Sequence, residues 1–177
     1  VVMEMEKLAL YVDERPRITV DDLNLMVSRT REDAIFELTE ALGKRQLGQS
    51  LSILNNLLSD GVHSLAILAS LRNYLRKLLV FNSIQATSSP PWRRGMSASE
   101  FQNSYLPGIK ESSEWQELLK GHPYGVFMSF NKAAEFTAGN LKKSLSLLLD
   151  AEFRLKGAPI PHNIILEELL IPLAKVN

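Results

Sequence analysis

The sequence predicts an all-α fold, a helical bundle with mostly short connections. Apolar residues recur at spacings of three and four along nearly every segment, which is the pattern of amphipathic helices. No segment shows the alternation of apolar and polar residues expected of a strand, and there is no internal repeat. The length of 177 residues, of which 45% are hydrophobic, is enough for one ordinary domain and a piece of a second.

The first part of the chain predicts two helices. The first has one apolar face and ends at the turn formed by Arg15 and Pro16, since proline cannot continue a helix. Thr19 and Asp22 form a capping box at the start of the second. The chain begins with Val1 in a segment of helical pattern, so we expect it to be a fragment of a longer protein.

Three further helices are expected in the middle of the chain. The spacing predicts a third helix over 35–43 and a fourth over 47–58, with Gly61 just past its end. Ser64 is expected to cap the fifth and longest helix, which runs to about Ala86. Its buried side is predicted to carry five leucines: Leu68, Leu71, Leu75, Leu78 and Leu79. This helix is expected to be the spine of the domain.

A region rich in proline and serine, 87–98, interrupts the helices and predicts an exposed loop. Short helices around Phe101 and Trp115 follow, the second with Ser113 and Gln116 as its capping box.

The last part of the chain predicts three more helices. Pro123 lies in the first turn of one of them. Asn140 is expected to cap the next, over 141–156, which Gly157 ends. The final helix begins at about Asn163.

The composition excludes several classes of function. The three histidines, His63, His122 and His162, have no carboxylate or second histidine at metal-ligand spacing, and the chain has no cysteine. Gly43-Lys44-Arg45 lacks the first glycine and the Ser or Thr of a phosphate-binding loop, so it is expected to end a helix. We expect no catalytic site, no cofactor and no metal. No apolar run is long enough to cross a bilayer, and the bacterial cytoplasm is the expected location.

One region has an unbalanced charge, although the chain as a whole carries 20 basic and 20 acidic residues. No acidic residue lies between Asp60 and Glu100. Five basic residues do: Arg72, Arg76, Lys77, Arg93 and Arg94. They are candidates for contacts with DNA phosphate or with an acidic partner helix. The alternative, favoured over DNA binding, is an ordinary basic helix flank paired with acids elsewhere in the fold.

Aromatic residues allow two interpretations. Trp92, beside Arg93 and Arg94 in the predicted loop, is either an exposed hot spot for a partner or a plug that folds back onto the bundle. Both remain open. The later aromatic residues are predicted to belong to the core: Tyr124, Phe127, Phe130 and Phe136.

The order of these helices resembles a known family. The resemblance rests on five stretches: Glu4–Tyr11, Ile18–Leu23, Ile35–Leu79, Ala151–Gly157 and Leu166–Leu170. Together they resemble the C-terminal part of the delta subunits of bacterial DNA polymerase III, which belong to its clamp loader. The segment 88–121 is longer and more irregular than the family pattern.

The resemblance implies a division of the chain and a function. Residues 1–28 would be the end of the helical lid module of the AAA+ family, and 29–177 the helical collar domain. The implied function is non-catalytic: the collar assembles delta with the gamma/tau and delta-prime subunits to support sliding-clamp loading in DNA replication. The sliding clamp would be contacted only by the missing N-terminal part, and DNA only indirectly or weakly.

Within such a collar, the outer face of the long helix and the final helix are expected to pack against neighbouring subunits. That outer face is predicted to carry Asn73, Arg76, Lys77 and Val80. The alternative function is a stand-alone helical DNA-binding domain, which would use four arginines: Arg72, Arg76, Arg93 and Arg94.

Overall fold

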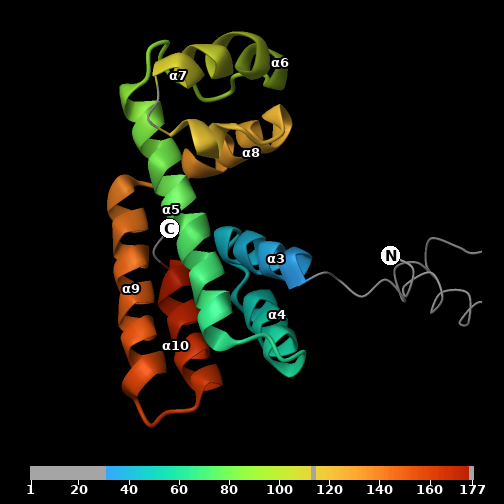
Figure 1. Cartoon of the computed structure of the whole chain (residues 1–177), viewed down its shortest axis with the longest axis vertical. Coiled ribbons are helices and arrows are strands. Elements are labelled where there is room, and N and C mark those ends of the chain that lie inside the picture. The colour runs from blue at the N-terminus through green and yellow to red at the C-terminus, as the bar shows by residue number, and fades with distance from the viewer. Residues whose placement is uncertain (1–30, 113–114, 176–177) are drawn as a thin grey trace, which may run out of the picture. The chain divides into compact units, whose positions relative to one another are not determined.

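The computed structural model describes residues 31–112 and 115–175 of the chain (Figure 1). The two helices predicted ahead of residue 29, and the capping box that begins at Ser113, lie outside the described residues. The chain divides into two compact units, and Ile35–Asn177 is the larger one. The predicted domains, 1–28 and 29–177, stay predictions.

Helices make up the fold, and the described residues contain no strand, which confirms the all-α prediction. The principal helices are α3 (Arg31–Gly43), α4 (Leu47–Ser59), α5 (Ser64–Thr87), α8 (Pro123–Ala133), α9 (Ala138–Gly157) and α10 (His162–Lys175). Shorter pieces are α6 (Ala98–Glu100), a π-helical turn η1 (Phe101–Tyr105), α7 (Leu106–Ser112) and a 3₁₀ turn η2 (Gln116–Leu119).

Helix α5 is the spine of the larger unit, as predicted. Its 24 residues pack against α9 and α10 at one end and against α8 at the other (Figure 1). Four of the five leucines predicted to be buried on it are buried: Leu68, Leu71, Leu75 and Leu78. Leu79 is only half-buried, because it lines a surface hollow beside α9. The buried arc of α5 therefore differs from the predicted one, because it leaves out Leu79 and includes Val80.

The core has an aliphatic part and an aromatic part. The aliphatic part lies among α4, α5, α9 and α10, whose buried leucines each contribute about 1.5–3 kcal/mol when removed from water. It includes Leu54, Leu57, Leu141, Leu148, Leu166 and Leu170. The aromatic part joins the far end of α5 to η1 and α8. Phe81 stacks on Phe130 at 4.4 Å between ring centroids, and Phe101 contacts Phe130 at 5.2 Å.

The N-terminal caps of the two long helices differ from the prediction. His63, not Ser64, caps α5: its Nδ1 accepts a hydrogen bond from the backbone N–H of Leu65. Thr137, not Asn140, caps α9, and the Asn140 backbone N–H donates to its hydroxyl. In both cases the predicted cap lies inside the helix: Ser64 is one position after the observed cap, and Asn140 is three positions after it.

Side chains from outside α8 satisfy the carbonyl groups at its C-terminal end. From α5, Asn82 donates to the carbonyl groups of Phe136 and Ala133, and Gln85 donates to that of Phe130. Arg94 donates to the carbonyl group of Ala134. These bonds add to the backbone hydrogen bonds that Phe130 and Ala133 already accept, and they tie α8 and the turn after it to α5 and to the loop.

Candidate protein-interaction site

A surface depression follows the line where α5 and α9 pack. The two helices run antiparallel, and two hollows of about 520 and 270 Å³ lie along them. We call this surface the α5–α9 groove. From α5 it is lined by Leu68, Arg72, Arg76, Leu79, Val80, Asn82, Ser83 and Ala86, from α9 by Ala138, Lys142, Leu145, Leu148, Leu149 and Glu152, and beside η2 by Trp115. Arg76 lines both hollows, so they are neighbours along the same pair of helices.

Helix α9 carries two apolar stripes, and only one of them is buried. The inner stripe faces the core and includes Leu141, Leu148, Ala151 and Leu155. The outer stripe, spaced at four residues, consists of Leu145, Leu149 and Phe153, of which Leu149 is 55% exposed and Phe153 70% exposed. A soluble helix with one buried face needs only the first stripe. The second stripe makes the groove and its rim apolar.

The charges along the groove are mostly basic. Arg72 forms an ion pair with Glu152 at 3.7 Å, and Lys156 contacts the same carboxylate at 2.6 Å. The hydrogen bond and charge of Lys156, together with the charge of Arg72, lower the pKa of Glu152. Arg76 and Lys142 have no ion pair or hydrogen-bond partner within residues 31–112 and 115–175. Two positive charges without a partner among the described residues therefore line the groove, Arg76 between the two hollows and Lys142 in the larger one.

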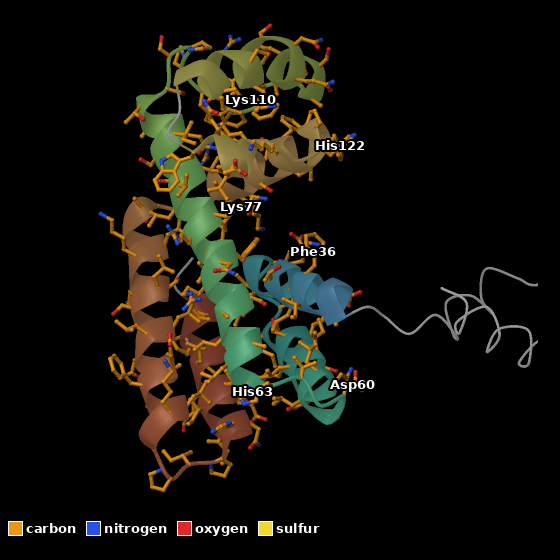
Figure 2. The ribbon with its side chains drawn as sticks, viewed as in Figure 1. Phe36, Asp60, His63, Lys77, Lys110 and His122 are labelled. Atoms are coloured by element: carbon orange, nitrogen blue, oxygen red, sulfur yellow. The ribbon has the colours of Figure 1, made fainter. Side chains whose placement is uncertain are left out.

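The six residues predicted as possible contacts do not form one site. Arg72 and Arg76 line the groove, but the pairing of Arg72 with Glu152 agrees with the alternative of a basic flank paired with acids elsewhere. Lys77, near the middle of α5 in Figure 2, is half-buried, and its Nζ lies 5.4 Å from the centroid of the Phe81 ring. Burial lowers the pKa of Lys77.

Of the three candidates in the loop, Trp92 belongs to the aromatic part of the core, and the two arginines are exposed. Trp92 is half-buried and contacts Tyr105 at 5.4 Å and Phe130 at 5.6 Å between ring centroids, so it is a plug that folds back onto the bundle. Its Nε1 is buried and has no hydrogen-bond partner among the described residues. Arg93 pairs with Glu100, and the carbonyl group of Ala134 accepts a hydrogen bond from Arg94. Arg93 and Arg94 are exposed, but each has a partner within the protein.

Two further predictions about exposure need correction. Val80 was expected on the outer face of α5, but it is only 8% exposed, because it faces the packed side of the helix as well as the groove. Tyr124 was expected in the core, but it is 57% exposed, while Phe130 and Phe136 are buried as predicted and Phe127 is half-buried. Tyr124 lies in the first turn of α8, beyond the reach of the core.

Sequence reasoning missed the α9 side of the groove. Lys142, Leu149 and Phe153 were interpreted only as parts of a helix. The outer stripe at 145, 149 and 153 is visible in the sequence as a second apolar periodicity beside the inner one. It is the signal that would have found the groove.

A small cavity of about 20 Å³ lies elsewhere, between α3, α5, α9 and α10. The Tyr74 hydroxyl at this cavity is buried and finds no hydrogen-bond partner within the described part of the chain. Burial raises the pKa of Tyr74, and the carboxylates of Glu40 and Glu135 raise it further. The cavity has room for about one water molecule, so it is too small to be a ligand site.

The histidines and carboxylates do not converge on a metal site. His63 and His122 lie at the starts of α5 and α8, at separate places on the molecule (Figure 2). In the described ranges no group of three or more histidines and carboxylates could hold a metal ion. No described helix is both long enough and apolar enough to span a membrane.

Comparison with known proteins finds similarity along the whole chain. No protein-family model matches it. The chain is 24% identical over 177 residues to DNA polymerase III subunit delta of Bacillus subtilis (strain 168), covering 45% of that protein. It is also 24% identical over 149 residues, 84% of its length, to the probable DNA polymerase III subunit delta of Aquifex aeolicus (strain VF5), covering 42% of that protein.

The fold gives the same result. The solved structure of the Bacillus subtilis DNA clamp loader delta protein matches 98% of the chain with a TM-score of 0.66 and 25% sequence identity, over 45% of its own length. The chain therefore resembles a clamp loader protein in both sequence and fold. The particular protein that it resembles is the delta subunit of bacterial DNA polymerase III, which confirms the resemblance predicted from the order of the helices in the sequence. The chain spans somewhat less than half the length of these relatives.

Proposed function

We propose that this chain is part of a clamp loader delta subunit and that residues 29–177 are its collar domain, with 1–28 the end of the AAA+ lid module. The observation that carries the proposal is the match in sequence and fold over essentially the whole chain to one kind of protein. In this role the chain is non-catalytic. It acts by holding the subunit in the loader during DNA replication in the bacterial cytoplasm.

The proposed partners are the gamma/tau and delta-prime subunits, which would pack against the collar. The sliding clamp would be contacted by the part of the subunit that this chain does not include. Two features support an assembly role: large hydrophobic side chains are exposed on several helices, and the apolar groove follows the longest two. Exposed apolar surface of this kind marks protein–protein contacts in soluble proteins.

The alternative of a stand-alone DNA-binding domain has less support. Of the four arginines that it would use, Arg72 and Arg93 pair with carboxylates and Arg94 is bonded to a backbone carbonyl group. Only Arg76 is unpaired within the described residues. A protein that releases few counterions on binding has only weak affinity for DNA at physiological salt.

The test is the assembly of the purified chain with the gamma/tau and delta-prime subunits of the same organism. Size exclusion with light scattering is expected to show a stable mixed complex, and the circular dichroism of the chain alone should show a folded helical protein. A folded chain that forms no complex with either subunit would contradict the proposal. Steep salt-dependent binding to duplex DNA by the chain alone would favour the alternative.

A further inference from the structure

We propose that the α5–α9 groove binds an amphipathic helix with an acidic edge, contributed by another subunit of the loader. This inference rests on the proposed function and adds to it the place and the chemistry of the contact. The groove, its outer apolar stripe and its unpaired basic residues carry the inference.

The shape of the groove suits a helix. Its lining residues extend along α9 from Ala138 to Glu152, about 21 Å at 1.5 Å per residue, which corresponds to about four helical turns, and the exposed Phe153 is the next residue. A groove between two packed helices accepts the apolar face of a third helix through residues spaced three and four apart. The two hollows, at the ends of the groove, would each take one or two such side chains.

The apolar surface supplies the anchors. Leu149 and Phe153 are exposed on the outer stripe, and Trp115 is 40% exposed at the other end of the groove. Large aromatic and aliphatic side chains near the centre of an interface carry most of its binding free energy. A partner helix that covers them removes this surface from water.

The basic residues of the groove favour a partner helix with acidic residues along one edge. Glu152, the one carboxylate that lines the groove among the described residues, is already paired with Arg72 and Lys156. Arg76 and Lys142 remain without partners in the described part of the chain and line the larger hollow of the groove. Acidic residues on the partner would meet these two charges and fix the register of the helix.

The same charges disfavour a second copy of this chain as the occupant. In a two-fold symmetric dimer the same patch meets itself, so Arg76 and Lys142 would approach their own counterparts. Like charges placed together at an interface weaken it. A DNA backbone would match the charges but would leave Leu149 and Phe153 without apolar partners.

A first experiment locates the occupant. The chain has no cysteine, so a Ser83→Cys variant can carry one photo-crosslinker inside the groove, and a Ser59→Cys variant carries it on the exposed surface of α4 as a control. With the gamma/tau subunit, crosslinks from position 83 are expected to map to one helix with apolar residues at helical spacing and acidic residues beside them. Crosslinks from both positions at equal yield, or from position 83 to a basic or non-helical segment, would overturn the proposal.

A second experiment measures the contributions of charge and apolar surface. Lys142→Glu is expected to weaken binding of gamma/tau at least tenfold, whereas Lys143→Glu, exposed on the same helix but outside the groove, should change it less than twofold. Glutamate at either position suits the N-terminal part of α9, so neither variant should impair folding. Phe153→Ala is expected to weaken binding at least tenfold, and Phe36→Ala, exposed on α3, to leave it unchanged.

The outcomes separate this inference from the proposed function. If the wild-type chain binds gamma/tau but Lys142→Glu and Lys143→Glu weaken binding equally, the groove is not the site and the proposed function stands. If the wild-type chain binds neither loader subunit, both fail. Loss of self-association in Lys142→Glu would overturn the inference in favour of a second copy of the chain. Loss of DNA binding alone would overturn it in favour of nucleic acid.

Discussion

Asn82 on α5 bonds to backbone carbonyl groups at the end of α8, about fifty residues later in the chain, so its removal tests the polar contacts between these two helices. Its Nδ2 donates to the carbonyl groups of Phe136 at 2.9 Å and Ala133 at 3.3 Å. A hydrogen bond contributes about 0.5–1.5 kcal/mol net, and this side chain is half-buried. Asn82→Ala is therefore expected to lower the free energy of unfolding by about 1–2 kcal/mol, or the Tm by about 2–8 °C.

Urea unfolding followed by circular dichroism measures this loss, and two variants make it specific. Asn55→Ala, at an exposed position of α4, removes the same amide without a comparable contact and is expected to leave stability unchanged or slightly raised. Asn82→Asp places a carboxylate against two carbonyl groups, so it should be less stable than Asn82→Ala at neutral pH. Equal midpoints for wild type and Asn82→Ala would refute the reasoning, as would a neutral-pH midpoint of Asn82→Asp above that of Asn82→Ala.

Three further predictions concern stability and are checked by the same unfolding assay. Gly61 has a φ of +77°, so Gly61→Ala is expected to lower the free energy of unfolding by about 1 kcal/mol, while Gly48→Ala within α4 should raise it by about 0.5–1 kcal/mol. A Gly61→Ala variant more stable than Gly48→Ala would contradict this. Trp92→Phe keeps an aromatic ring in place and removes a buried donor without a partner, so it should lower the free energy of unfolding by under about 1 kcal/mol. Trp92→Ala should lower it by about 2–3 kcal/mol, and equal losses in the two variants would be inconsistent with the aromatic plug. Glu152→Gln should be less stable than the wild-type chain above pH 4.5, the ordinary pKa of a glutamate, because ion pairing lowers the pKa of Glu152 in the folded state. The difference in stability should shrink as the pH falls through that lowered pKa, and a difference that does not change with pH would argue against ion pairing.

The sequence predicted the long helices well because their periodicity is local. Helix α5 was expected from Ser64 to about Ala86 and extends from Ser64 to Thr87. The caps were harder, since a cap accepts a hydrogen bond from a residue two or three positions later, and several polar residues near a helix start can do so. Thr137 and Asn140 are the two ends of one such bond, and the sequence alone did not show which was the acceptor.

The candidate site was only half predictable. Arg72 and Arg76 were found from the lack of nearby acids, but the partner of Arg72 is Glu152, eighty residues later, on a helix whose neighbour the sequence does not specify. The two interpretations of Trp92 differed only in tertiary contacts, which periodicity does not report. Once α5 and α9 are known to be antiparallel neighbours, the outer stripe of α9 becomes one wall of the groove.

The end of α5 and the start of α9 lie next to each other, since Ala86 and Ala138 line the same hollow. The intervening segment, 88–137, thus begins and ends at one place on the bundle, and between these points α8 packs against α5. Loop closure becomes only slightly more costly as an exposed loop lengthens, by about 0.6 kcal/mol for each doubling. Insertions and deletions in the exposed loops of this segment can therefore accumulate over evolution without changing the register of α5 against α9. In protein engineering, the exposed tips of this segment are the natural place to insert a second domain.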